Sequence, residues 1–302
     1  MTTVDTAHRR RDLVALIVAI GAVSLSGPMM TATDAPALGI AFWRNALGAA
    51  VLAPFVLRNR AVLRGLTRAQ WTAMALAGVL LGLHFAFWIP SLRYTSIAAS
   101  TALVATQVVW AALLAYLAGH RAPRAEWIGI AIALIGVVLL TGIDISLTPR
   151  ALIGDALALL GALGSAAYMH VGQRVRPSLP LTTYTGIVYA TAALTLGLIC
   201  AAGSVPLTGY GTQAWLLIGA VTVVAQFGGH SLLNMALRSF SATAVSIAIL
   251  FEMPGSTLVG WWWPGQQPPL ALLPAALLII GGIVLVLRAS RPTTLDPEAA
   301  TP

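Results

Sequence analysis

Six polar side chains stand inside long apolar stretches of this sequence, and their types could do chemistry: Arg44, His84, Gln107, His170, His230 and Glu252. A charge near the middle of a membrane-spanning helix costs about 2.5 to 3.5 kcal/mol on insertion scales, so each group needs a physical reason to be there. A carboxyl or imidazole group can take up and release a proton, and a guanidinium group attracts anions. Such groups can form a proton-coupled or substrate-binding site.

The spacing of four of these residues repeats at about half the length of the chain. His84 and His230 are 146 residues apart, and Gln107 and Glu252 are 145 apart. In a duplicated chain each pair occupies equivalent places, so all four side chains could converge near one pseudo-twofold axis. For Glu252 we predict proton coupling or substrate contact, with a structural hydrogen bond to a neighbouring helix as the alternative. For the histidines, a place in a transport pathway competes with ordinary interhelical hydrogen bonding.

The remaining polar residues allow more than one interpretation. Arg44 neutralises Glu252, contacts an anionic group of a substrate, or extends its side chain toward the interface from a shallow position. His170 lies near the end of its apolar run and is expected at the interface. Cys200 is the single cysteine, so one chain offers neither a disulfide nor a cysteine metal site, and we expect a buried or lipid-facing role in packing.

The elements that carry these residues are membrane-spanning helices. Of the 302 residues, 58% are hydrophobic and 9% are charged, against roughly 25% charged in an ordinary soluble domain. The predicted fold is therefore an all-α integral membrane protein with ten transmembrane helices. Apolar runs near the length of about 20 residues that spans a bilayer lie at 13–32, 36–57, 71–90, 97–118, 126–142, 152–172, 181–202, 213–236, 242–263 and 269–288.

Arginine supplies all seventeen basic residues, and its distribution predicts the orientation. Loops rich in Lys and Arg remain in the cytoplasm. With the N-terminus inside, fourteen arginines fall in cytoplasmic segments, Arg93 and Arg150 fall outside, and Arg44 lies within the second run. Both termini are therefore expected in the cytoplasm. The arginines form a topology signal rather than a surface for nucleic acid.

Short matches at an offset of 143 to 146 residues run in order through both halves of the chain. Residues 12–16 (DLVAL) resemble 155–159 (DALAL), and residues 92–96 (LRYTS) resemble 237–241 (LRSFS). Five spans in each half force the second copy to insert upside down, which predicts two inverted five-helix repeats. Such repeats suit alternating access, in which two half-structures rock about a site near the midplane.

The predicted organisation follows from the repeat. It consists of a cytoplasmic N-terminal tail, a first five-helix repeat, a periplasmic or extracellular linker, a second five-helix repeat and a cytoplasmic C-terminal tail, at 1–12, 13–142, 143–151, 152–288 and 289–302.

Several motifs resemble those of the drug/metabolite transporter (DMT) superfamily and its EamA-type members, which have two five-helix repeats. They are residues 42–47 (FWRNAL), 83–85 (LHF) with 91–96 (SLRYTS), 229–234 (GHSLLN) and 251–254 (FEMP), and the likeness covers nearly the whole chain. The resemblance implies efflux of small organic solutes such as amino acids, amines or toxic compounds, driven by the proton gradient.

The chain also departs from the family pattern at four places. Val109 stands where proline is common, the pairs 119–120 (GH) and 265–266 (GQ) stand where Gly-Glu is common, and one extra residue separates Glu252 from Pro254. These departures concern the coupling residues and the substrate rather than the fold.

Together these features predict a secondary active transporter of an inner or plasma membrane rather than an enzyme. We expect Glu252 to exchange a proton for substrate, His84 and His230 to orient the substrate, and Arg44 and Gln107 to complete the site. The expected partners are a small-molecule substrate, a proton and membrane lipid, with a homodimer left open and with no cofactor, metal ion or nucleic acid. The alternatives are an intramembrane enzyme, a channel or a non-transporting scaffold. Saturable, gradient-dependent uptake separates a carrier from the last two.

Overall fold

The computed structural model describes residues 3–91, 93–95, 97–141, 148–262 and 269–289, and within these ranges every regular element is a helix. The first half contains α1 (Thr3–Ser24), α2 (Ser26–Thr31), α3 (Ala37–Arg58), α4 (Arg60–Gly65), α5 (Arg68–Ser91), α6 (Ile97–Ala105), α7 (Gln107–Leu117) and α8 (Arg124–Thr141). The second half contains α9 (Pro149–Val175), η1 (Arg176–Ser178), α10 (Leu181–Ala202), α11 (Thr212–Val221), η2 (Thr222–Ser231), α12 (Leu232–Ala236), α13 (Ala242–Ile249), α14 (Glu252–Trp262) and α15 (Leu272–Ala289).

Ten helical units among the described residues are long and apolar enough to cross a membrane, which confirms the predicted fold class. We number them spans 1 to 10 in chain order. The third, at Arg68–Ser91, and the seventh, at Leu181–Ala202, lie close to the predicted runs. α1 begins at Thr3, so the first helix reaches back into the predicted N-terminal tail.

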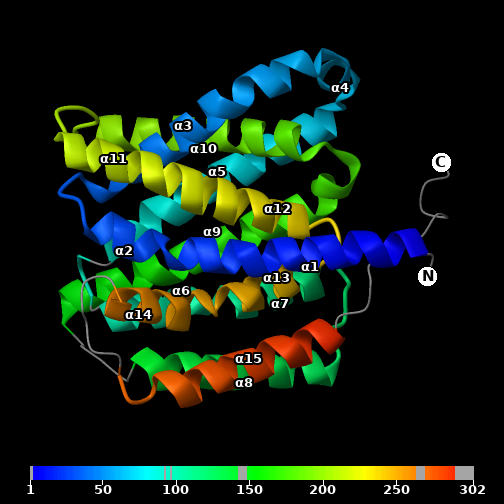
Figure 1. Ribbon diagram of the computed structural model, residues 1–302, viewed down its shortest axis with the longest axis vertical. Coiled ribbons are helices and arrows are strands. Elements are labelled where there is room, and N and C mark those ends of the chain that lie inside the picture. Colours follow the sequence, from blue (N-terminus) through cyan, green and yellow to red (C-terminus); the bar gives the residue numbers. More distant parts are fainter. Residues whose placement is uncertain (1–2, 92, 96, 142–147, 263–268, 290–302) are drawn as a thin grey trace.

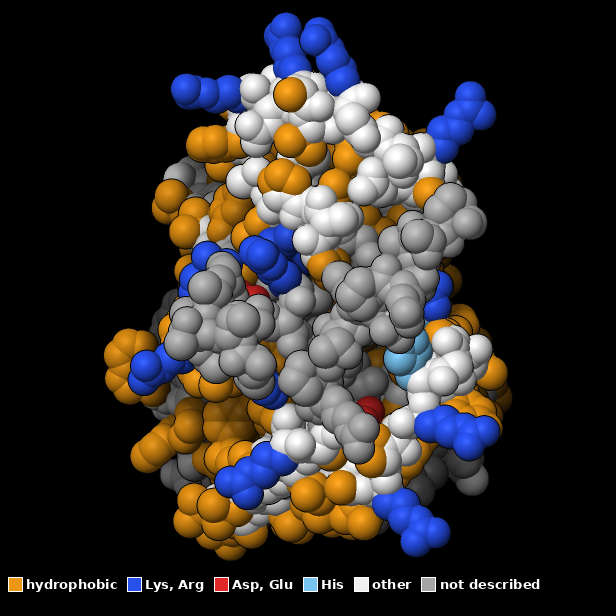
Figure 2. All heavy atoms as spheres, turned by 90° about the vertical axis from the view of Figure 1, so that its right-hand side faces the viewer, with side chains coloured by type: hydrophobic (Ala, Val, Ile, Leu, Met, Phe, Trp, Pro, Cys, Tyr) orange, Lys and Arg blue, Asp and Glu red, His pale blue; other side chains and the backbone are white. Residues whose placement is uncertain are grey.

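The spans lie side by side and alternate in direction (Figure 1). α1 begins and α15 ends at the same end of the molecule, as an even number of crossings requires. We call this the termini end and the other the opposite end. Figure 2 looks onto the termini end, where basic side chains, all of them arginine, project around the rim.

The packing of the spans follows the inverted repeat. α5 packs along α9, which joins span 3 to span 6. In the same way α1 packs along η2 and α12, which joins span 1 to span 8. Two further large contacts pair spans with their own repeat partners, α3 with α10 and α8 with α15. Exchanging the two halves leaves these pairings unchanged, as expected for two inverted copies around one axis. α5 also packs closely on α10, spans 3 with 7, whereas its counterpart between α3 and η2 is smaller.

Small residues allow the close crossing of α8 and α15. A Cβ atom at Gly129 would lie 2.8 Å from the carbonyl oxygen of Gly282, and one at Gly136 would lie 2.8 Å from that of Ala275. Exchange of the halves converts one contact into the other, since Gly129 and Ala275 are 146 residues apart, as are Gly136 and Gly282. Close backbone approach of this kind is the usual basis of helix association in lipid.

Proline explains the break in span 1. α1 ends at Ser24 and α2 begins at Ser26, and Pro28 cannot donate a hydrogen bond to the Ser24 carbonyl four residues earlier. The hydroxyl group of Ser256 on α14 donates to that carbonyl at 2.8 Å instead. The partner helix thus satisfies the backbone group that the proline frees, which is how lipid-embedded helices tolerate such breaks.

Spans 4 and 9 break at equivalent places. α6 ends before Thr106 and α13 ends before Leu250, so Gln107 and Glu252 each begin the second helical segment of their span. Span 8 departs from the α-helix in a different way, with a π-helix, η2, over ten residues. Interrupted spans and π-helical segments are typical of substrate and ion sites.

Candidate functional site

Arg44 lies at the centre of a buried polar network. Its side chain is 1% exposed, so the guanidinium group does not extend out of the protein. Nε donates a hydrogen bond to Oε1 of Gln226 at 2.8 Å, and Nη1 donates to Oγ of Ser26 at 3.3 Å. Nη2 makes no hydrogen bond among the described residues. One donor group of a buried guanidinium is therefore uncommitted.

Gln226 joins Arg44 to two neighbouring spans. Its Nε2 donates to Oδ1 of Asn45 at 2.9 Å. Tyr189 Oη donates to the backbone carbonyl of Gln226 at 3.0 Å and lies 2.9 Å from the hydroxyl group of Ser231. Spans 2, 7 and 8 are thereby connected at one level, and the π-helix presents Gln226 and Ser231 toward the same neighbours.

An aromatic ring occupies the centre of the group. The Arg44 guanidinium lies 5.0 Å from the ring centroid of Phe85, a cation–π contact. The edge of His230 meets the same ring at 5.5 Å, and His84 tilts against it at 5.0 Å. Phe85 therefore brings together the cation and the two repeat-related histidines that the sequence paired.

His84 has a fixed orientation. Its Nδ1 lies 2.8 Å from the carbonyl oxygen of Gly161 on α9, so Nδ1–H donates and Nε2 remains as an acceptor in the neutral ring. The ring also stacks on Trp88 at 5.7 Å with an interplanar angle of 13°. Gly161 and Gly164 permit this approach, because a Cβ at Gly164 would lie 3.2 Å from the His84 Cα.

Glu252 faces the network from span 9. The side chain is half-buried and makes no hydrogen bond among the described residues. It interacts electrostatically with Arg44, which in turn interacts with His84 and His230. No ion pair joins Arg44 and Glu252 in the described part of the chain. We call Arg44, Asn45, His84, Phe85, Gln226, His230 and Glu252 the central cluster.

Three residues singled out in the sequence lie apart from this cluster. Gln107 is buried at the start of α7, and no described contact joins it to Arg44 or Glu252. His170 is half-buried near the termini end of α9, close enough to Arg174 and His120 to interact electrostatically. Cys200 is a buried free thiol within α10. The structure thus assembles four of the five predicted site residues.

Sequence reasoning missed the residues that hold Arg44 in place. Asn45 follows Arg44 directly, and Gln226 precedes His230 by four residues, so both lie beside residues already singled out. A single uncharged amide side chain in an apolar run is a weak sign of function. The role of Asn45 and Gln226 can be recognised only when the fold brings spans 2 and 8 together.

The chemistry available to the cluster is that of binding and proton exchange. It offers one cation, one carboxyl group, two imidazoles and aromatic surface. Within the described residues no three His, Cys, Asp or Glu side chains gather closely enough to hold a metal ion.

Ten spans in two inverted repeats, interrupted beside buried ionisable groups, define a multi-pass membrane protein with the architecture of a secondary transporter. The model of the EamA-like transporter family matches residues 11–142 and 152–288. The chain belongs to this family of transporters, which confirms the resemblance seen in the sequence.

No curated protein matches the chain. A solved structure described as "Crystal structure of protein" is similar over 93% of this chain and 98% of its own, with a TM-score of 0.74 and 21% sequence identity. At that identity the likeness shows the fold alone.

Proposed function

We propose that this transporter exports small metabolites by alternating access and couples export to proton entry. The observation that supports the proposal most directly is the relation of Arg44 to Glu252. Opposite charges interact across the central cluster, yet they form no ion pair with each other among the described residues. A substrate can therefore engage both groups.

The proposed cycle follows from charge balance. Deprotonated Glu252 binds a cationic amine of the substrate, while Nη2 of Arg44 can donate to an acidic group. When the substrate leaves, the negative charge of Glu252 must be neutralised again, and binding of a proton neutralises it. Binding of substrate and binding of the proton are then mutually exclusive, which is the requirement for exchange of one against the other.

The histidines shape the site in this proposal. His84 presents Nε2 as an acceptor because its other ring nitrogen is committed to Gly161. His230 packs on Phe85, and its Nδ1 makes no hydrogen bond among the described residues. Both rings can therefore orient polar groups of a substrate. Gln107, related to Glu252 by the repeat, is assigned to the pathway by symmetry only.

We place the protein in a cell membrane with both termini in the cytoplasm. Arginines crowd the termini end, which supports that orientation by the preference of basic loops for the cytoplasm (Figure 2). The division into tails, linker and two repeats stays a prediction, since residues 142–147 and 290–302 lie outside the described residues. In this orientation, substrate leaves through the opposite end.

The test is transport by the purified protein in proteoliposomes. Amino acids, amines and toxic cations are supplied one at a time with and without an imposed pH gradient. We expect saturable, gradient-driven flux of at least one, and we expect Glu252→Gln to abolish the response to the gradient while retaining the fold.

The control is Glu126→Gln, which alters the other membrane-span glutamate, on α8 and outside the central cluster. It should leave coupling intact. Full gradient-driven flux with Glu252→Gln would show that the coupling group lies elsewhere.

A further inference from the structure

Two helix contacts at the termini end lack a repeat-related counterpart at the opposite end of the molecule. At the termini end, α7 of span 4 packs against α13 of span 9. Exchange of the halves converts this contact into one between α14 and α6 at the opposite end, but no comparable packing joins those two helices among the described residues. For this pair of helices, the repeat-related surfaces are together at the termini end and apart at the opposite end.

A second pair of helices shows the same asymmetry. α9 of span 6 contacts α13 at the termini end, whereas no comparable packing joins its counterpart, span 1, to α6. In an inverted-repeat protein the two alternating forms are related by exchange of the halves, so such differences identify which end is closed.

Gln173 makes a polar contact between spans 6 and 9 at the closed end. Its Oε1 accepts a hydrogen bond from the backbone N–H of Ala242 at 2.7 Å, at the first residue of α13. The first N–H groups of a helix have no partner within it. The N-cap Ser241 satisfies Ala244, so a side chain from span 6 supplies the acceptor that Ala242 lacks. One turn deeper, the hydroxyl group of Ser246 lies 3.6 Å from the Met169 sulfur.

We propose that this is the form of the transporter closed at the termini end, and that Gln173 is a positioning residue that holds it closed by binding the start of α13. The proposal rests on the alternating access proposed above. It assigns to span 6 a gating role that none of the central-cluster residues performs.

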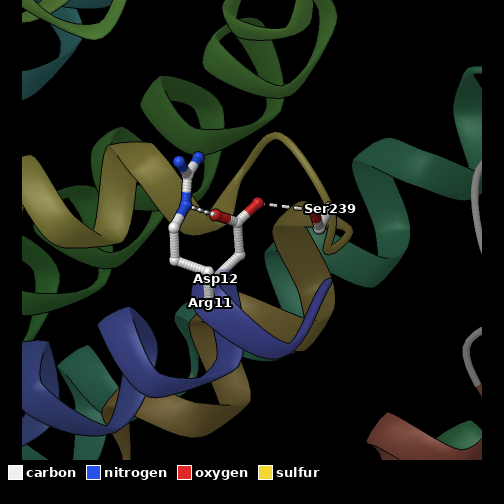
Figure 3. Close-up of polar contacts among 3 residues, drawn as sticks. All are labelled: Arg11, Asp12 and Ser239. Atoms are coloured by element: carbon white, nitrogen blue, oxygen red, sulfur yellow. Dashed lines mark hydrogen bonds and ion pairs between the residues drawn. The ribbon is translucent and has the colours of Figure 1, made fainter. Parts of the chain in front are cut away.

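A neighbouring contact supplies a matched control. The hydroxyl group of Ser239, three residues before Ala242, donates to Oδ2 of Asp12 at 2.5 Å, and the other Asp12 oxygen lies 3.6 Å from Nε of Arg11 (Figure 3). This contact joins span 1 to the segment that follows span 8, and spans 1 and 8 pack together along their length. Losing it should leave the gate unchanged.

The experiment measures the reaction of two reporter thiols with a charged maleimide, in purified full-length protein in lipid nanodiscs with Cys200→Ala. Ala112→Cys reports on the closed interface, where Ala112 is buried with Ile247 and Leu250. Thr257→Cys, 145 residues later on half-exposed α14, reports on the equivalent place at the opposite end. We expect the thiol at 257 to react faster than the thiol at 112.

Gln173→Leu removes the acceptor at nearly constant size. It should raise the rate at position 112 by about fivefold, the equilibrium effect of one ordinary hydrogen bond, and lower the rate at position 257. Gln173→Glu keeps an oxygen and adds a charge suited to a helix N-terminus, so it should hold the rate at 112 at or below that of the parent. Ser239→Ala should change neither rate.

The two rates must move in opposite directions, because a merely structural role would loosen both ends together. Unchanged rates, or a parallel rise, with Gln173→Leu would overturn the proposal. If that variant fails to fold, Gln173→Glu decides alone, and a raised rate at 112 refutes the gate. The assay needs no substrate and no gradient, so its failure is distinct from failure of the transport proposal.

Discussion

At the level of single residues, the central cluster depends on how a buried guanidinium group is stabilised inside a membrane protein. Arg44 is held by hydrogen bonds to Gln226 and Ser26 and by the face of Phe85. These contacts offset desolvation without neutralising the charge. The cation therefore stays available to attract an anion, whether from Glu252 or from a substrate.

Removing the Gln226 amide group that supports Arg44 should lower the stability of the protein. Gln226→Leu leaves Nε of Arg44 and Oδ1 of Asn45 without their partner, and we expect a loss of about 1 to 3 kcal/mol in the free energy of unfolding. Thermal unfolding in detergent measures it. Val223→Leu, on the same helix and 65% exposed, is the control and should have almost no effect. Equal stability of the two variants would contradict the supporting role.

The sequence allowed prediction of the ionisable members of the cluster but not of their supports. His84, His230, Arg44 and Glu252 are conspicuous because charges in apolar runs are expensive. Asn45 and Gln226 carry no charge, and their importance arises from a contact between residues 181 positions apart. Gln107 was predicted from symmetry, but the two ends of this structure are not in equivalent arrangements.

At the scale of elements, helix crossings are set by residues that lack a side chain. Gly282→Ala would place a Cβ 2.7 Å from that of Ala133, so α15 and α8 must separate. We expect a lower unfolding temperature, corresponding to about 1 to 3 kcal/mol of overpacking. Gly281→Ala, one residue away with nothing within 4 Å, should not destabilise the protein. A similar loss of stability in both variants would show that glycine is needed at position 282 for helix flexibility rather than for close contact with α8.

Hydropathy predicted the spans well and their interruptions poorly. Average apolarity over about 20 residues indicates that a segment crosses the lipid. It carries no information on which backbone hydrogen bonds the segment makes. Pro28 and Pro254 lie in two of the interrupted spans, 1 and 9. Val109 stands 145 residues before Pro254, so the break at Thr106 occurs without proline and had no comparable signal.

At the scale of the whole molecule, orientation is directly testable. In a Cys200→Ala background, Thr67→Cys lies in an exposed loop at the termini end and Thr208→Cys in an exposed loop at the opposite end. A membrane-impermeant maleimide applied to intact cells should label position 208 at once and position 67 only after permeabilisation. The reverse pattern would place both termini outside and invert the proposed direction of transport.

The proposed transport cycle requires that substrate binds at the central cluster, and ligand-induced thermal stabilisation of the purified protein tests this binding. A ligand at a hundredfold excess over its dissociation constant stabilises the native state by about 2.7 kcal/mol. Amino acids, amines and toxic cations are screened first, and any stabilising compound is tested again with Glu252→Gln, His84→Ala and His230→Ala. We predict that these three variants lose the stabilisation, whereas His170→Ala, outside the cluster, retains it. A compound that stabilises all four variants equally would place the binding site elsewhere.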